Sequence, residues 1–62
     1  MYSLEKLVWG YCIKAPNPHG KYYIYVSKVH RNGKYEFTTD YTYAKFMSRK
    51  TAEKHLSILN GG

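Results

Sequence analysis

The dipeptide Asn32-Gly33 constrains this chain most, because it lies between two segments that have the composition of β-strands. Asn and Gly adopt the positive φ angles of a type I′ turn at little cost, and that turn joins antiparallel strands through a two-residue loop. The flanking residues 22–29 and 35–39 are rich in aromatic and β-branched side chains, which favour strands. We therefore predict a β-hairpin over residues 21–39.

The predicted two-residue loop also sets which side chains share a face of the hairpin, because it pairs His30 with Tyr35 and Val26 with Thr39. We assign one face to the core, with Lys28 reaching out along its edge; this face carries Tyr22, Ile24, Val26, His30, Tyr35 and Phe37. The opposite face carries Lys21, Tyr23, Tyr25, Ser27, Val29, Arg31, Lys34, Glu36 and Thr38. Tyrosines among cations and hydroxyls indicate a binding surface, for which the candidate contact residues are Lys21, Tyr23, Tyr25, Arg31 and Lys34.

The segment before the hairpin predicts one more strand. Residues 7–14 alternate in polarity, which places Trp9, Tyr11 and Ile13 toward the core, while Gly10 permits a bulge or a close neighbour. Residues 1–6 either extend this strand or form a helical turn. Residues 15–20 contain two prolines and are expected to form the connection to the hairpin.

The last third of the chain predicts a helix. After the hairpin, Asp40 either caps a short helical turn that runs to Ala44, with Phe46 and Met47 then entering the core, or residues 45–47 form a further strand. Ser48 is a suitable N-cap for a helix over residues 49–59. The buried stripe of this helix is expected to be Ala52, Leu56 and Leu59, with Ile58 beside it, and a glycine after the last turn favours its C-terminal cap.

These elements predict a single small domain over residues 1–62, of the α+β class. A three-stranded antiparallel sheet, connected as a β-hairpin meander, carries one C-terminal helix packed on one face, in the order β-β-β-α. The face with Tyr23 and Tyr25 is left open. Because Cys12 is the only cysteine, no internal disulfide is expected.

The charge of the chain favours an acidic partner. Ten Lys and Arg residues stand against four acidic ones, for a formal net charge of +6. No apolar run approaches the roughly 20 residues of a membrane span, and residues 1–5 lack the features of a signal peptide. We therefore expect a cytoplasmic protein that does not act on membranes.

No pattern in the sequence predicts catalysis. The residues that could serve a nucleophilic or metal site are not connected by any motif or zinc-site spacing; they are Cys12, His19, His30, Asp40 and His55. Gly61-Gly62 allows a ubiquitin-like carrier as an alternative, but a helix that is last in the chain explains these glycines as its cap. The chain is expected to be no enzyme and to hold no cofactor and no metal.

Nucleic acid is the alternative partner. Tyr23 and Tyr25 could stack on bases while Lys21, Arg31 and Lys34 contact phosphates. In element order the chain resembles the arm-binding domains of phage integrases and the plant AP2 domains, which lay a three-stranded sheet in the major groove of DNA. The arginine-rich strands of those domains are missing here, since the open face carries one arginine, Arg31, and also Glu36.

A second resemblance concerns the stretch that begins at Gly33 and ends at Leu59. It resembles short uncharacterised bacteriophage proteins in which Phe-Thr-x-Asp leads through Ala-Lys-x-Phe to Ser-Arg/Lys-Lys-x-Ala-Glu and a closing helix. The matching positions are Phe37, Thr38, Asp40, Ala44, Lys45, Phe46, Ser48, Lys50, Ala52 and Glu53. The resemblance implies an accessory protein that acts by binding in the cytoplasm of a bacterial host. The resulting hypothesis is a non-enzymatic module that modulates or inhibits an acidic host protein, with DNA or RNA as the alternative target.

Overall fold

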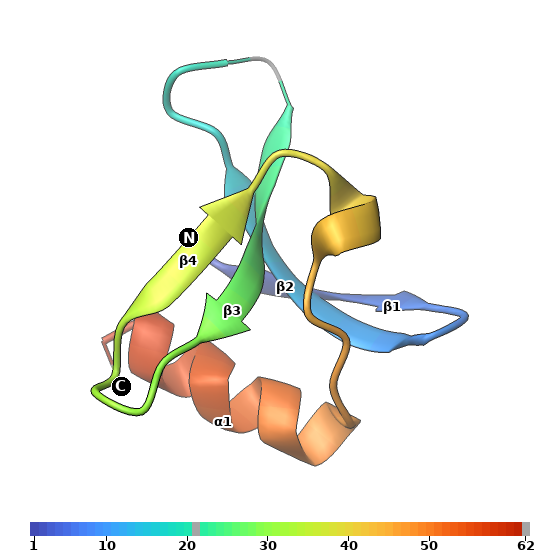
Figure 1. Cartoon of the computed structure of the whole chain (residues 1–62), viewed down its shortest axis with the longest axis vertical. Helices are drawn as coiled ribbons and strands as arrows, with labels where there is room; N and C mark the ends of the chain where they lie inside the picture. The colour runs from blue at the N-terminus through green and yellow to red at the C-terminus, as the bar shows by residue number, and fades with distance from the viewer. Residues whose placement is uncertain (21, 62) are drawn as a thin grey trace.

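The computed structural model describes residues 1–20 and 22–61, so Lys21 of the predicted binding surface and the terminal Gly62 lie outside the described residues. Its elements are β1 (Ser3–Leu7), β2 (Gly10–Pro16), β3 (Tyr23–Val29), β4 (Tyr35–Thr38), a short 3₁₀ turn η1 (Tyr41–Tyr43) and α1 (Arg49–Leu59). The strands form one antiparallel sheet in the order β1-β2-β3-β4, and α1 packs against one of its faces (Figure 1). The α+β class and the C-terminal helix are confirmed, whereas the prediction of three strands is wrong, because there are four.

The additional strand arises from a turn inside the segment that the alternation predicted to be one strand. Val8 and Trp9 form a two-residue turn, and Leu7 pairs with Gly10 across it. Gly10 has a φ of 130°, which a residue with a Cβ rarely adopts. Trp9 therefore lies on a turn rather than in the core, and 65% of its surface is exposed.

The β3–β4 hairpin has a different register from the predicted one. Val29 pairs with Tyr35 instead of Glu36, because three residues rather than two separate His30 from Lys34. The His30 amide donates to Lys34 O over 2.8 Å, and Gly33 alone in the loop has a positive φ, of 88°. The Asn32 side chain accepts from the Lys34 amide over 3.1 Å instead of entering a type I′ turn. A loop of three residues that ends in a positive-φ glycine is the next most common hairpin connection.

An irregularity between Val26 and Lys28 then changes which side chains share a face. A β-bulge breaks the alternation, so Val26 and Val29 both pack on the core. Lys28 pairs with Glu36, and the Lys28 side chain is exposed. The prediction that Tyr22 belongs to the core is also wrong, since 79% of its surface is exposed.

The core lies between the sheet and α1. Its fully or nearly buried members come from β2, β3, the η1–α1 connection and α1, namely Ile13, Val26, Met47 and Ala52. Half-buried side chains surround them: Tyr2, Leu4, Tyr11, Val29, Tyr35, Leu56 and Leu59. The predicted helix stripe is therefore confirmed, while Ile58 is exposed.

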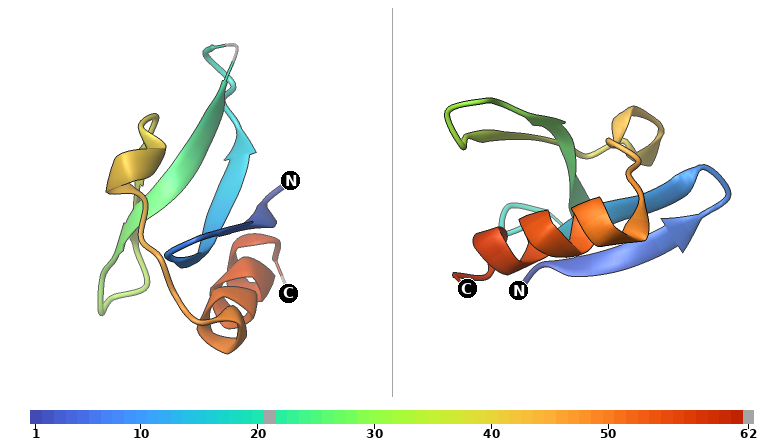
Figure 2. Two further views of the ribbon diagram at one scale, coloured as in Figure 1. Left: turned by 90° about the vertical axis from the view of Figure 1, so that its right-hand side faces the viewer. Right: turned by 90° about the horizontal axis from the view of Figure 1, so that it is seen from below.

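Both ends of α1 are capped, the first by a side chain and the last by backbone amides. Ser48 Oγ accepts from the Thr51 amide over 3.3 Å, as predicted for an N-cap, and Gly61 follows the last turn with a positive φ. Asn60 joins the helix to the first strand, because its side chain accepts from Tyr2 N over 3.0 Å and donates to Tyr2 O over 3.1 Å. The right-hand view in Figure 2 shows the C-terminal end of α1 close to the start of β1.

The η1–α1 connection bridges β2 and β3. Lys45 N donates to Val26 O over 2.8 Å, and Met47 exchanges two backbone hydrogen bonds with Tyr11, of 2.8 and 2.9 Å. Asp40 caps the helical turn η1, and Met47 then forms an isolated β-bridge with Tyr11. The two alternatives that the sequence left open, a helical turn and a short strand, therefore both have a counterpart in the structure.

Because Met47 lies close to Gly10, we expect a methyl group added at Gly10 to destabilise the fold more than one added at Gly33. A Cβ on Gly10 would lie 3.0 Å from Met47 O, whereas a Cβ on Gly33 would meet nothing within 4 Å, although both glycines have a positive φ. Gly33→Ala should lower the free energy of unfolding by about 1–2 kcal/mol through backbone strain alone. Gly10→Ala should cost about 1–3 kcal/mol more, because of the collision. Urea denaturation of the two variants checks this, and equal losses would contradict it.

Candidate functional site: an aromatic groove and a basic end

The structure does not bring the predicted contact residues together. Tyr23 and Tyr25 lie near the start of β3, on the face opposite α1, whereas Arg31 and Lys34 belong to the loop beyond its end. Arg31 is six positions beyond Tyr25, and a straight strand of that length would span about 20 Å at 3.3 Å per residue. The described members of the predicted surface therefore form two separate groups.

The first group, Tyr23 and Tyr25, is here called the tyrosine group, and its surroundings are other side chains of the same chain. Lys14 Nζ lies 4.4 Å from the centre of the Tyr23 ring and 3.5 Å from Glu5 Oε1. Burial raises the pKa of the Tyr25 hydroxyl, and the Glu5 carboxylate raises it further. Since these side chains already satisfy one another, this face is a poor candidate for the primary contact with a partner.

Cys12 lies beneath the same group and is fully buried. Burial raises the pKa of its thiol, and the Glu5 carboxylate raises it further. A thiol that is both inaccessible and protonated is a weak nucleophile at neutral pH. This agrees with the packing role that a single cysteine on a strand suggests.

An open aromatic groove was missed by the sequence analysis. It is a hollow of about 440 Å³ lined by Trp9 from the β1–β2 turn and by Thr42 and Phe46 from η1 and the connection that follows it. The centres of the Trp9 and Phe46 rings are 5.5 Å apart, with their planes tilted by 57°. The η1–α1 connection therefore supports the exposed indole on one side only.

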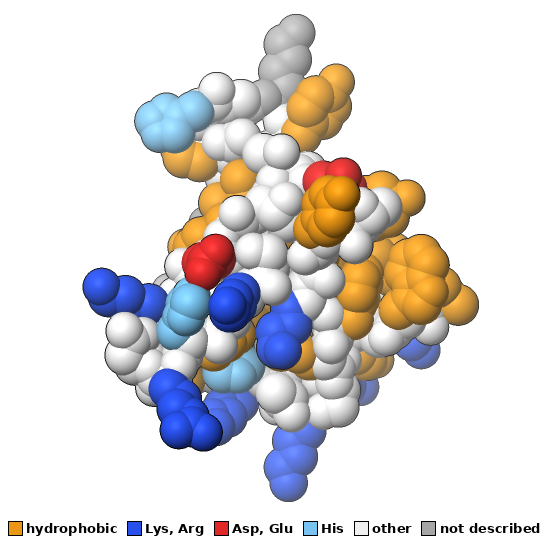
Figure 3. All heavy atoms as spheres, in the orientation of Figure 1, with side chains coloured by type: hydrophobic (Ala, Val, Ile, Leu, Met, Phe, Trp, Pro, Cys, Tyr) orange, Lys and Arg blue, Asp and Glu red, His pale blue; other side chains and the backbone are white. Residues whose placement is uncertain are grey.

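The rim of the groove is also apolar. Val8 adjoins Trp9 and is 87% exposed, while Tyr41 and Tyr43 flank Thr42 and Tyr43 is 72% exposed. The space-filling view shows this apolar surface over the β1–β2 turn and η1 (Figure 3). The sequence did contain a signal for the turn that exposes Trp9, because Val8-Trp9 directly before a glycine is compatible with a turn. The alternation of residues 7–14 favoured a strand instead.

Asp40 holds the η1 side of the groove in place. Its carboxylate accepts from Thr42 N over 2.9 Å and from Thr42 Oγ1 over 2.7 Å. These two hydrogen bonds hold the pKa of Asp40 below its ordinary value of 3.8, and the bond from the Thr42 side chain has the larger effect. The carboxylate beside the groove is thus charged at neutral pH.

The second group is a basic end made by the β3–β4 loop and α1, with Arg31, Lys34, Lys50 and Lys54 as its members. All four are exposed. Figure 1 and the left view of Figure 2 show the loop and α1 at the same end of the molecule. Sequence reasoning identified Arg31 and Lys34 but did not join them to the helix, because only the tertiary structure brings these elements together.

Two of the three histidines have side-chain partners within the chain. His30 Nε2 pairs with Glu36, and the hydroxyl of Tyr35 lies 2.9 Å from His55 Nδ1. Across residues 1–20 and 22–61, no group of three or more His, Cys, Asp and Glu side chains is arranged to hold a metal ion.

None of the helices that the structure describes has the length and apolar character needed to span a membrane. Comparisons with protein-family models, curated proteins and solved structures found no match to this chain. The groove and the basic end are therefore the two surfaces of this chain that can indicate a function.

The hydrogen bonds of Asp40 predict its titration. Because the pKa is lower in the folded state, the stabilising effect of the cap is complete above the ordinary value of 3.8 and is lost as the pH falls through the folded pKa. Thr42→Val should move the pKa of Asp40 toward 3.8, but not entirely, since the Thr42 amide still donates. NMR titration of the carboxyl carbon measures this shift.

Thr38→Val is the matched control, because Thr38 Oγ1 accepts from the Asp40 amide over 3.1 Å and does not contact the carboxylate. The control should leave the pKa of Asp40 unchanged. An unchanged pKa in Thr42→Val would show that the side-chain hydrogen bond does not stabilise the charged form.

Proposed function

We propose that this chain is a non-enzymatic binding module that holds a protein partner through the aromatic groove. The observation that carries the proposal is Trp9, an indole that is 65% exposed at the side of a hollow while one face packs against Phe46. Tryptophan and tyrosine dominate the energetics of protein interfaces, especially where they enclose a pocket. Contiguous apolar surface of this kind marks interaction sites on small proteins.

The exposed part of the indole is large enough to anchor a complex. A tryptophan presents about 200 Å² of side-chain surface, so covering the exposed 65% at about 25 cal/mol per Å² contributes about 3 kcal/mol. That corresponds to about two orders of magnitude in Kd. A side chain that fills the groove would gain further contact with Phe46 and the methyl group of Thr42.

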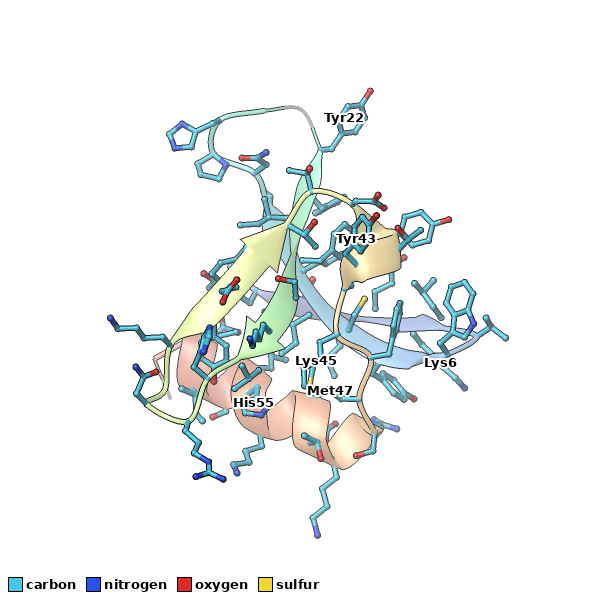
Figure 4. All side chains as sticks on the ribbon, viewed as in Figure 1. Lys6, Tyr22, Tyr43, Lys45, Met47 and His55 are labelled. Carbon is cyan, nitrogen blue, oxygen red and sulfur yellow. The ribbon has the colours of Figure 1, made fainter. Side chains whose placement is uncertain are left out.

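The partner proposed for the groove is a protein segment with an apolar anchor residue and acidic neighbours. Figure 4 shows Lys6 on the β1–β2 side of the η1–α1 connection and Lys45 on its β3 side. Lys6 Nζ is 6.0 Å from the centre of the Tyr11 ring, so its side chain lies along the sheet. With a formal net charge of +6, the chain would also attract an acidic surface during encounter.

The groove is better suited to a protein than to nucleic acid. Its wall includes Thr42, which binds the charged Asp40 carboxylate. A nucleic-acid strand brings a phosphate with every base and would place negative charge near this carboxylate. A protein segment can place a neutral residue there, so the charge distribution favours the protein.

The setting that we propose is the cytoplasm of a bacterial host, where the module modulates or inhibits a host protein. The support is the resemblance of residues 33–59 to short bacteriophage proteins. Three of the matching positions, Asp40, Lys45 and Phe46, lie in or beside the groove. The same pattern that indicates this setting thus also builds one side of the proposed binding site.

Two variants test the role of the groove. Trp9→Ala should abolish retention of the partner from nuclease-treated bacterial lysate, because it removes the anchor. Tyr22→Ala is the matched control, since Tyr22 is a similarly exposed aromatic residue at the far end of β3 (Figure 4). Thermal unfolding verifies that both variants fold.

With the purified partner, Trp9→Ala should weaken binding by about 100-fold, as expected for about 3 kcal/mol. Trp9 is the single tryptophan, so its fluorescence reports directly on the groove and should shift to the blue when a partner excludes water. Equal losses in the two variants, or an unchanged emission on binding, would refute the groove as the binding site. Loss of every protein partner after nuclease treatment would refute the protein-binding function itself.

A further inference from the structure

We propose that the basic end binds the phosphate backbone of nucleic acid, at a surface separate from the aromatic groove. Its members come from two elements, the β3–β4 loop with Arg31 and Lys34 and the helix α1 with Lys50 and Lys54. Lys28 on β3 and Lys45 in the η1–α1 connection are exposed cations outside this group. This proposal goes beyond the proposed function and does not depend on it.

The positive charge of this surface is not neutralised within the described chain. None of the ion pairs in the described part of the chain involves Lys28, Arg31, Lys34, Lys45, Lys50 or Lys54. The two nearest carboxylates in sequence are already engaged, since Glu36 pairs with His30 and Glu53 lies 3.2 Å from Arg49. The basic end therefore exposes four cations that take part in none of these ion pairs, which favours an anionic partner.

Two features of the charge pattern of α1 are unfavourable, although Arg49 and Glu53 form a favourable pair one turn apart. Its first turn contains Arg49 and Lys50 and no acidic residue, although the helix dipole favours negative charge at this end. Lys50 and Lys54 are four residues apart, so two like charges lie one turn from each other and repel. A polyanion beside the helix would relieve both unfavourable interactions, which supports a binding role for these residues.

Nucleic acid fits this surface better than an acidic protein does. Protein interfaces depend on aromatic or arginine anchors and are depleted in lysine. The β3–β4 loop and α1 contain no Phe, Tyr or Trp, and three of the four members of the basic end are lysines. Such flexible single charges suit phosphates, which provide charge without requiring a shaped pocket.

The dimensions also agree with a duplex. An α-helix of 11 residues is about 16 Å long at 1.5 Å per residue. One strand of a duplex carries a phosphate about every 3.4 Å along the axis, so α1 spans roughly five phosphates. The β3–β4 loop at the same end of the molecule adds contacts beside the helix (Figure 2). With both surfaces occupied, the chain would hold a protein next to nucleic acid.

Salt dependence is the experiment that tests this proposal. Binding to a fluorescent DNA duplex of about 20 base pairs is followed by anisotropy at several salt concentrations, with an RNA duplex of the same sequence in parallel. The variant Arg31→Ala/Lys34→Ala/Lys50→Ala/Lys54→Ala should bind at least 100-fold more weakly at low salt. Its slope of log K against log salt should be shallower by about 3–4, because each lost phosphate contact changes the slope by about 0.9.

Two controls separate the basic end from the groove. Lys6→Ala removes one cation beside the groove and Trp9→Ala removes its anchor, and both should leave duplex binding within about 3-fold. Equal affinity for DNA and RNA would support recognition of the backbone alone, and a preference for one of them would identify the source of the phosphates. Circular dichroism verifies that the quadruple variant keeps its helix.

Three results would overturn the proposal: no binding of either duplex at low salt, an unchanged salt slope in the quadruple variant, or displacement of the duplex by poly-glutamate at equal charge concentration. The last would assign the surface to acidic polypeptides in general. Because Trp9→Ala affects only the groove and the quadruple variant affects only the basic end, failure of this inference is distinguishable from failure of the proposed function.

Discussion

The two backbone hydrogen bonds between Tyr11 and Met47 are the interaction on which the rest of this structure depends. They require Gly10, because any Cβ at that position would meet the carbonyl group of Met47. They also attach the η1–α1 connection to β2, which places Met47 in the core and Phe46 against Trp9. The same contact thus positions the start of α1, part of the core and one wall of the groove.

The largest exposed aromatic cluster and the basic end lie on different elements. The β1–β2 turn and η1 expose aromatic side chains, while the β3–β4 loop and α1 expose cations, and a sheet only four strands wide keeps the two regions apart. Near the start of β3, Lys14 contacts both the Tyr23 ring and Glu5. A chain of 62 residues therefore has room for both of the contact surfaces that we propose, without a large cleft.

Local signals in the sequence predicted the elements that depend on neighbours in the chain. The caps at Asp40 and Ser48, the bounds of α1 and its buried stripe all agree with the structure. The errors arise where two local patterns competed. The alternation of residues 7–14 concealed the turn at Val8-Trp9, and Asn32 used its side chain to accept a hydrogen bond instead of adopting a positive φ. That one-residue difference in the loop, with the bulge near Ser27, changed the faces of the hairpin.

The sequence by itself determined the α+β class, the C-terminal helix and the excess of positive charge, while Arg31 and Lys34 stay a prediction. Only the tertiary structure decided that Trp9 and Phe46 form a groove and that the β3–β4 loop lies at the same end as α1. The physical reason is the range of the interactions. Caps, turns and helical periodicity act over a few residues, whereas the groove depends on the contact between Gly10 and Met47, which are distant in the chain and leave no local pattern.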